Sequence, residues 1–268
     1  MKIKRIGLIA GGGELPFLFL KKAREKNIDV VLFSIHGETD NRLHKLVEKK
    51  YDIKLTALSD IIKSCKKEKI KKIILLGYVR HSNLIKNIKF DLRTLKVLLR
   101  VKDKRASSIL KSAIKELKTE GIDVIDSRFL LSDIISGTGF LTKTKAIKKH
   151  LEDIFFGYKI AKKIAAADIG QTVVIKNKVV ISVEAIEGTD ECIKRGAKLA
   201  GAGFVVVKVA RPNQDMRFDI PVIGIKTIKI LKKYNAAGIA IEAGKTFLLD
   251  KEKLLRIANK NKIFIYGM

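Results

Sequence analysis

Hydrophobic residues in the first half of the chain form short runs that alternate with amphipathic segments. Runs such as IGLIA and KIILLGYV suit buried strands, and the segments between them repeat apolar residues every three or four positions, as helices do. Strands that alternate with helices predict a parallel sheet covered on both faces. The predicted strands are residues 3–10, 30–35, 72–79 and 122–125, and the predicted helices are 14–26, 57–68, 84–100 and 104–120.

The second half alternates in the same way after a glycine-containing loop, SGTGF, at residues 136–140. We place a domain boundary at this loop, which predicts two α/β domains, residues 1–138 and 139–268. The predicted helices of the second domain are 145–167, 190–199, 227–233 and 251–259. Its predicted strands are 172–175, 179–185, 204–207, 238–242, 246–249 and 263–266.

The chain has 268 residues, of which 47% are hydrophobic, so two globular domains can each bury a core. No uncharged apolar stretch is long enough to span a bilayer. The first apolar run is short and glycine-rich, which favours a strand over a signal peptide, and we expect a cytoplasmic protein. Two distant cysteines, Cys65 and Cys192, and four scattered histidines argue against a disulfide framework, a zinc site or Cys–His catalysis.

The formal net charge of +28 at first suggests a nucleic-acid partner. The excess of cations is spread evenly along the chain, however, and Lys and Ile are both abundant, as codon bias in an AT-rich genome would produce. Aromatic residues, at 6%, are too few for extensive base-stacking surfaces. A diffuse positive field still favours phosphorylated ligands or an anionic membrane surface.

The segment GLIAGGGELP combines a strand, a glycine turn and the start of a helix. Glycines let backbone amides approach a phosphate, and a helix N-terminus favours the anion. The dinucleotide fingerprint is incomplete, because Pro16 stands where a third glycine belongs and no carboxylate directly follows the second strand. A nucleotide-contacting turn and a plain tight turn are therefore both open for Gly11, Gly12 and Gly13.

The segment from Leu84 to Arg100 predicts a basic amphipathic helix. Its apolar stripe contains Ile85, Ile88, Leu92, Leu95 and Leu99, and its cationic stripe contains Lys86, Lys89, Arg93, Lys96 and Arg100. Packing of the apolar stripe on the core is the common arrangement for such a helix. Contact with an anionic membrane surface is the alternative.

The densest polar segment follows the buried run GFVVV and reads KVARPNQDMRFDIPVIG, residues 208–224. Two prolines bracket it and oppose a continuous helix, so we predict a stiffened loop after a strand, where α/β proteins place their chemistry. Carboxylates suit Mg²⁺ and arginines suit phosphate, whereas a surface loop held by ion pairs is the alternative. The candidates are Lys208, Arg211, Gln214, Asp215, Arg217 and Asp219.

Other predicted strand ends of the second domain also carry polar residues. The block VEAIEGTDECIKRG lies between a strand and a helix that Thr189 or Asp190 could cap. Its carboxylates are Glu184, Glu187 and Asp190, and the segments ADIGQT and IEAGKT add Asp168, Gln171 and Glu242. Such loops could converge on one face and bind a metal ion or sugar hydroxyls, and helix capping alone is the alternative.

Five blocks resemble, in order and over nearly the whole chain, the UDP-2,3-diacylglucosamine pyrophosphatases of the LpxI type. They are GLIAGGGELP, ADIGQTVVI, VEAIEGTDE, KVARPNQDMRFDIPVIG and AIEAGKTFLLD. The resemblance implies an N-terminal Rossmann-like domain, a distinct C-terminal α/β catalytic domain and substrate held between them. It also implies hydrolysis of UDP-2,3-diacylglucosamine to 2,3-diacylglucosamine 1-phosphate (lipid X) and UMP in lipid A biosynthesis, supported by Mg²⁺ or another divalent cation, with water attacking the sugar-side phosphorus.

The resemblance assigns roles to residues that match its blocks. Catalysis would fall to Asp219, Asp215 and Arg217, and metal binding to Asp219, Asp215, Glu187 and Asp190. Substrate binding would fall to Gly11, Gly12, Gly13, Arg80, Thr189, Gln171, Lys208 and Gln214. The two aspartates of the loop are not ranked. Peripheral contact with the inner-membrane surface and oligomerisation stay open, and no nucleic-acid partner is implied.

The chain departs from the family pattern at Tyr78, where we expect a lysine, so a phosphate contact there rests on Arg80. Three other functions compete with the family reaction. They are a nicotinamide-dependent oxidoreductase on a Rossmann domain, a hydrolase of another nucleoside-diphosphate sugar, and a basic RNA- or membrane-binding protein without enzymatic activity.

Overall fold

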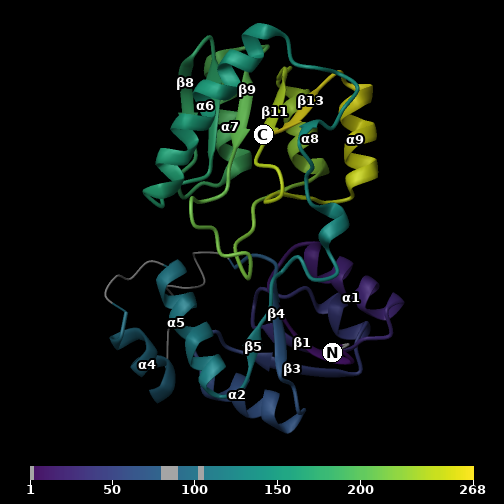
Figure 1. Cartoon of the computed structure of the whole chain (residues 1–268), viewed down its shortest axis with the longest axis vertical. Helices are drawn as coiled ribbons and strands as arrows, with labels where there is room; N and C mark the ends of the chain where they lie inside the picture. Colours follow the sequence, from purple (N-terminus) through teal and green to yellow (C-terminus); the bar gives the residue numbers. More distant parts are fainter. Residues whose placement is uncertain (1–2, 80–89, 102–105) are drawn as a thin grey trace. The chain divides into compact units, whose positions relative to one another are not determined.

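The computed structural model describes residues 3–79, 90–101 and 106–268. The chain divides into two compact units, Met1–Leu131 and Ser132–Met268 (Figure 1). Each unit has its own sheet and flanking helices, which confirms the α/β prediction. The predicted boundary after residue 138 lies inside the second unit, because Ser136 donates its amide to Thr246 and its hydroxyl to Glu242.

The first unit contains five parallel strands in the order β3-β2-β1-β4-β5 within the described residues. This order reverses between β1 and β4, as in doubly wound nucleotide-binding sheets. The strands are β1 (Arg5–Ala10), β2 (Asp29–Ile35), β3 (Lys49–Ile53), β4 (Lys72–Leu76) and β5 (Asp123–Val124). The helices are α1 (Leu15–Glu25), the short 3-10 helix η1 (Asn41–Lys45), α2 (Leu58–Lys67), α4 (Leu92–Leu99) and α5 (Ala106–Thr119).

The central strands of the first unit are buried on both faces. Ile6 and Leu8 of β1, and Val31, Leu32 and Phe33 of β2, have no exposed surface. Parallel sheets covered on both sides require such continuous apolar runs, which is why these strands were predicted from the sequence.

The second unit contains a mixed six-stranded sheet in the order β6-β13-β11-β9-β7-β8 and a small parallel pair, β10 with β12. Strands β9, β11 and β13 are parallel, whereas β6, β7 and β8 pair antiparallel with their neighbours. The bounds are β6 (Gly139–Phe140), β7 (Thr172–Lys176), β8 (Val179–Val183), β9 (Val205–Lys208), β10 (Val222–Ile223), β11 (Gly238–Ile241), β12 (Phe247–Leu248) and β13 (Phe264–Gly267). The helices are the short 3-10 helix η2 (Ser132–Ile134), α6 (Lys148–Ala166), α7 (Thr189–Ala200), α8 (Ile225–Lys233) and α9 (Lys251–Lys260).

Two apolar layers hold the second unit together. On one face of the sheet, Val205 and Val207 pack with residues of α6, and on the other face Val206 packs with residues of α7, α8 and α9. Helix α6 approaches closely because Gly157 has no side chain; a Cβ there would lie 2.7 Å from Ile175 Cγ1. None of the described helices is long and apolar enough to cross a membrane.

Several elements differ from the sequence prediction. Strand β3 was missed because its sequence, KKYDI, has only one buried residue, Ile53, and so lacks an apolar run. The two-residue strands β6 and β10 were too short for a pattern to reveal as separate elements, whereas β5 lies within the predicted strand 122–125. Helix α4 covers only part of the predicted helix 84–100, of which residues 84–89 lie outside the described part of the chain.

Candidate active site

Polar residues of the second unit gather where β9 and β11 end and where β7 begins. Lys208 ends β9 and pairs in register with Thr172 at the start of β7 and with Ile241 at the end of β11. Because β7 runs antiparallel to β9, its first residue lies at the same edge of the sheet as the ends of the parallel strands. The predicted convergence of strand-end loops is therefore confirmed for these segments.

A chain of hydrogen bonds, which we call the Lys208 cluster, links Lys208, Thr189, Thr172, Glu184 and Gln171. Lys208 Nζ donates to Thr189 Oγ1 at 2.8 Å, and Thr189 Oγ1 donates to Glu184 Oε1 at 2.9 Å. The backbone amide of Gln171 donates to Glu184 Oε2 at 3.2 Å, and Thr172 Oγ1 lies 3.4 Å from Thr189 Oγ1. A buried cation is thereby attached to the first turn of α7, since Thr189 begins that helix.

The environment of Lys208 disfavours its charge. Burial lowers the pKa of the Lys208 ammonium group, while the negative charges of Glu184, Asp190 and Asp219 oppose that shift. Beside it, Gln171 Oε1 is buried and has no hydrogen-bond partner among the described residues. Lys208 and Thr172 are buried and the other three members of the cluster are half-buried, and charged ligand groups interact more strongly in such surroundings than in open water.

Arg211 joins two loops next to the Lys208 cluster. Its Nε donates to Asp168 Oδ1 at 2.7 Å, and its Nη1 forms an ion pair with Asp219 Oδ2. Both aspartates have left-handed backbones, with φ of +60° and +54°, a conformation that Asp adopts more readily than most residues. The Asp219 side chain is 52% exposed, against 19% for Asp168, so Asp219 is held by Arg211 and still faces solvent.

The rest of the 208–224 loop is held by its own side chains. Gln214 Nε2 donates to the carbonyl oxygens of Phe218 and Asp219, at 3.1 and 2.9 Å. Asp215 accepts three hydrogen bonds from Arg217, one from the backbone amide and two from the guanidinium group. The ion-pair alternative for this loop therefore describes Asp215 and Arg217, and the Gln214 amide group is engaged in shaping the loop.

The four carboxylates predicted to bind a metal ion do not gather into a ready-made metal centre. Each forms an ion pair with a different cation: Asp215 with Arg217, Asp219 with Arg211, Glu187 with Arg195, and Asp190 with Lys226. In residues 3–79, 90–101 and 106–268, no group of three or more His, Cys, Asp or Glu is placed to hold a metal ion. The large excess of cations gives each carboxylate its own partner, which the residue spacing alone did not reveal.

Glu242 ties the loop after β9 to the end of β11. It is 6% exposed and accepts hydrogen bonds from Lys162 Nζ at 3.0 Å, Lys245 Nζ at 2.7 Å and the Ala210 amide at 2.9 Å. Burial favours the neutral carboxyl, but the hydrogen bonds from Lys245 and Lys162 outweigh it and lower the pKa of Glu242. Sequence reasoning missed Lys162, because it is one of many lysines on α6 and no motif distinguishes it.

The glycine turn of the first unit is closed by backbone hydrogen bonds. The Gly11 amide donates to the Leu76 carbonyl and the Gly12 amide to the Tyr78 carbonyl, both at 2.8 Å. The turn lies where the strand order reverses, at the nucleotide-binding position of such sheets, but two of its three amides are used within the protein. The exposed Tyr78 ring packs on the turn, since a Cβ on Gly12 would lie 2.9 Å from its Cζ.

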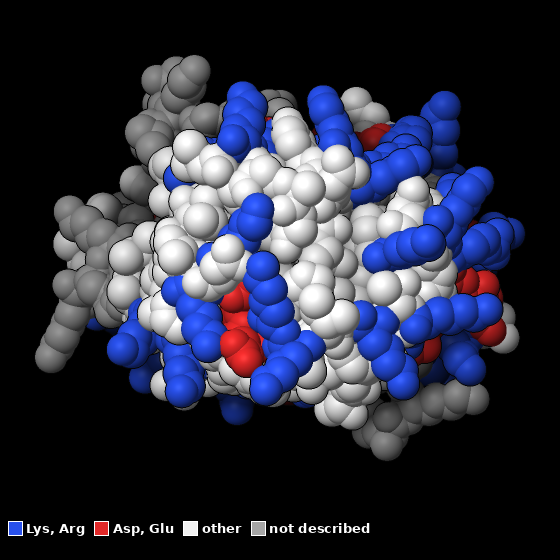
Figure 2. Space-filling model, turned by 90° about the horizontal axis from the view of Figure 1, so that it is seen from above, with Lys and Arg blue, Asp and Glu red and all other residues white. Residues whose placement is uncertain are grey.

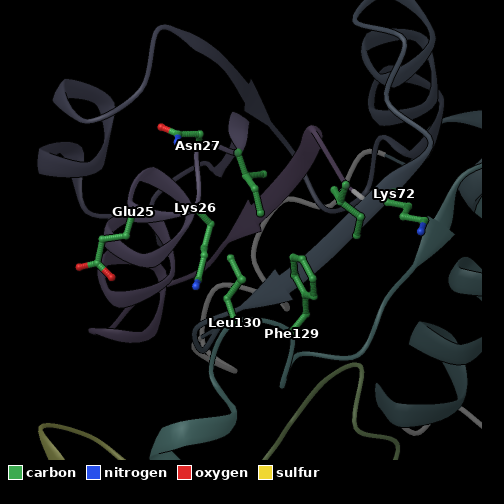
Figure 3. Close-up of a pocket in the computed structure, with 8 residues that line it drawn as sticks. Glu25, Lys26, Asn27, Lys72, Phe129 and Leu130 are labelled. Carbon is green, nitrogen blue, oxygen red and sulfur yellow. The ribbon is translucent and has the colours of Figure 1, made fainter. Parts of the chain in front are cut away.

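Arg80, the cation expected near that turn, lies outside the described residues. A cavity of about 570 Å³ in the first unit lies elsewhere, at the amino ends of β1, β2 and β4 (Figure 3). Its lining is Ile3, Glu25, Lys26, Asn27, Ile28, Lys72, Phe129 and Leu130. None of the predicted site residues within the described ranges lines it.

Positive charge is not confined to the candidate site. Figure 2 shows a face on which Lys and Arg side chains lie in many separate groups around uncharged residues, with fewer Asp and Glu. This agrees with the even distribution of cations along the sequence.

The fold and these side chains define a two-unit α/β protein whose second unit carries a charged strand-end site suited to anionic ligands. Sequence models of the LpxI N-terminal and C-terminal domains match residues 5–134 and 137–266. The chain is 27% identical, over 99% of its length and 98% of the relative, to the UDP-2,3-diacylglucosamine pyrophosphatase LpxI of Caulobacter vibrioides. The chain belongs to the LpxI family.

Two solved structures resemble the chain weakly. The biotin carboxylase domain of a thermophilic 2-oxoglutarate carboxylase matches at 15% identity and a TM-score of 0.28, covering 65% of this chain and 35% of that one. Phosphoribosylglycinamide synthetase from Anaerococcus prevotii matches at 11% identity and a TM-score of 0.25, covering 72% of this chain and 43% of that one. At such scores these structures carry no argument about fold or activity.

Proposed function

We propose that this protein hydrolyses the pyrophosphate of UDP-2,3-diacylglucosamine to give 2,3-diacylglucosamine 1-phosphate and UMP, a step of lipid A biosynthesis. The observation that carries the proposal is the coverage of both halves of the chain by the two LpxI domain models, together with the named relative that aligns from end to end. The site supports it, because the family blocks in the second unit meet at one sheet edge and supply cations, hydroxyls and a solvent-facing carboxylate.

In this reaction water adds to the sugar-side phosphorus, the bond from that phosphorus to the bridging oxygen breaks, and UMP leaves with the bridging oxygen. We assign to Asp219 the role of orienting the attacking water, because its side chain faces solvent and its backbone is fixed by the loop. Lys208 and Arg211 would stabilise the charge that develops on the phosphate oxygens. The first turn of α7 adds backbone amides, since no side chain caps it.

We also propose that turnover requires Mg²⁺ or another divalent cation. The carboxylates form no cage of their own, so the cation would be held by one or two of them together with phosphate oxygens of the substrate, as Mg²⁺ often is. Asp219 is the carboxylate we propose as the protein ligand of this cation, because its side chain is exposed. Such a cation would neutralise charge on the pyrophosphate.

Isotope labelling tests the reaction and its direction together. The protein is incubated with UDP-2,3-diacylglucosamine in water carrying the heavy oxygen isotope, and both products are weighed by mass spectrometry. We expect the label in 2,3-diacylglucosamine 1-phosphate and none in UMP. Label in UMP would move the attack to the other phosphorus, and absence of both products from folded protein would contradict the proposed function.

A substrate panel separates the nearest alternative. UDP-glucose and UDP-N-acetylglucosamine, which lack the two acyl chains, should yield UMP at a rate at least about a hundredfold lower, since binding energy from remote substrate groups supports turnover. Comparable rates would favour a hydrolase of other nucleoside-diphosphate sugars.

Because the proposed substrate is a lipid, we also infer peripheral contact with a membrane surface.

A further inference from the structure

Helix α4 of the first unit turns its apolar stripe toward solvent. Leu92 and Leu99 are 80% and 78% exposed, and Leu95 and the neighbouring Phe90 are each 42% exposed. Leu92, Leu95 and Leu99 are spaced by three and four residues, so they lie on one side of the helix. Core packing of this stripe, the common arrangement for amphipathic helices, is therefore absent for Leu92 and Leu99 and only partial for Leu95.

The opposite side of α4 buries Thr94 and Val97, and polar contacts at the first turn of the helix fix it to the unit. Asp91 accepts hydrogen bonds from the amides of Thr94, at 2.6 Å, and of Ser59 in α2, at 2.7 Å. Arg93 Nε donates to Glu116 of α5 at 2.8 Å. These contacts set the rotation of the helix, so the leucines cannot turn inward without breaking a shared cap and an ion pair.

Cations border the exposed leucines on one side. Lys96 and Arg100 follow Leu92 and Leu99 around the helix, and both are exposed. An apolar stripe beside a cationic one matches the cross-section of a lipid surface, where acyl chains lie beneath anionic headgroups. The chain as a whole adds a net charge of +28, which attracts anionic membranes at long range.

We propose that the outer face of α4 is the surface by which this protein docks on an anionic lipid bilayer. Leu92, Leu95 and Leu99 insert among the outermost acyl carbons, and Lys96 and Arg100 lie at the headgroups. This surface goes beyond the proposed hydrolysis, and it explains how an enzyme acting on a diacylated substrate can reach it in the membrane. Burying two such leucines favours the bound state by about a hundredfold or more.

Vesicle flotation tests the proposal without any substrate, so its outcome is independent of the proposed reaction. The full chain is mixed with vesicles of phosphatidylglycerol and phosphatidylcholine, or of phosphatidylcholine alone. We expect binding to the anionic vesicles and a loss of at least about tenfold in affinity for the double variant Leu92→Gln/Leu99→Gln. The matched control, Leu199→Gln, changes a leucine on α7 that is 72% exposed and should bind as the wild type does.

A second pair of variants tests the charges. Lys96→Gln/Arg100→Gln should lower affinity for anionic vesicles by about fivefold per charge and leave weak binding to phosphatidylcholine unchanged, whereas the exposed Lys198→Gln on α7 should have a smaller effect. All of these side chains are exposed, so thermal melting should stay at the wild-type temperature. Unchanged vesicle binding by the leucine variant would overturn the proposal. So would a wild-type dimer that the variant converts to a monomer while vesicle binding persists, because the leucines would then contact a second copy.

Discussion

The loops at the strand ends of the two units are held by different kinds of contact. In the first unit, two amides of the glycine turn after β1 donate to the carbonyl oxygens of Leu76, at the end of β4, and of Tyr78, just after it. In the second unit, side chains at the strand ends bind residues of other segments. Lys208 donates to Thr189, Arg211 donates to Asp168, and Glu242 accepts from the backbone amide of Ala210. The first edge is built from backbone and the second from side chains.

This difference shows that a motif's position does not settle its chemistry. The glycine turn stands at the position where doubly wound sheets bind nucleotides, yet its hydrogen bonds serve the fold. The second edge contains a buried cation, a bridged pair of aspartates and an unused amide oxygen, which are groups that a phosphate-bearing ligand can engage. We therefore expect changes at the second edge to affect turnover and changes at the first edge to affect stability.

The largest effect should come from Asp219→Asn. Loss of the solvent-facing carboxylate should lower kcat by about 10²–10⁴-fold and leave UMP affinity within about twofold of wild type. Asp215→Asn is the matched control, because Asp215 serves the loop through Arg217 and its loss should cost less than tenfold. Steady-state kinetics and calorimetric titration with UMP measure both. Near-normal turnover by Asp219→Asn would place the chemistry elsewhere.

Lys208→Met should follow, with kcat/KM lowered by about 10²–10³-fold, since a cation aimed at developing phosphate charge is removed. Methionine keeps most of the side-chain volume, so the unit should still fold. Lys176→Met is the control, because Lys176 binds the Ala200 carbonyl oxygen away from the cluster. If both variants lost activity equally, the effect would reflect general charge and not the Lys208 cluster.

Gly11→Ala should destabilise the first unit by about 1–3 kcal/mol, because its Cβ would lie 2.4 Å from the Tyr78 carbonyl oxygen and would push the backbones apart. Gly12→Ala would meet only the Tyr78 ring, which is 61% exposed and can move, so it should cost less than about 1 kcal/mol. Urea unfolding compares the two. A large loss of UMP affinity in Gly12→Ala, with stability kept, would instead support a nucleotide-contacting turn.

The smallest effect concerns pH. Because the pKa of Glu242 is lowered below its usual value of 4.5, its ionised form stabilises the fold above that pH, and the contribution is lost as pH falls through the lower folded pKa. Glu242→Gln should therefore cost about 1–2 kcal/mol at pH 7, with the difference from wild type shrinking on acidification. Glu191→Gln, which breaks an exposed pair with Lys194, should change little at any pH. A constant difference across pH would contradict the assignment.

Much of the fold could be predicted because apolar runs and helical periodicity report burial directly. Strands β1, β2 and β9 show this, whereas β3 is mostly exposed and carried no such signal. Within the site, the polar blocks were visible, but their partners were not. Spacing could not show that Arg211 bridges Asp168 and Asp219, which are far apart in the chain, or that Lys162 reaches from α6 to Glu242 after β11.

Helix α4 is a second case in which the sequence pattern did not reveal the contacts between elements. Periodicity identified an apolar and a cationic stripe, but it could not show that the buried residues of the helix, Thr94 and Val97, belong to neither stripe. The shared cap at Asp91 and the ion pair of Arg93 decide this, and they depend on residues in α2 and α5.

The most direct test of the account is the release of UMP from UDP-2,3-diacylglucosamine by the wild-type chain, measured with Mg²⁺ and again with excess EDTA. We predict UMP and 2,3-diacylglucosamine 1-phosphate in equal amounts with Mg²⁺, and loss of turnover with EDTA that added Mg²⁺ restores. Equal rates in both conditions would contradict the proposed metal requirement. Absence of UMP from folded, Mg²⁺-supplied protein would contradict the assigned reaction itself.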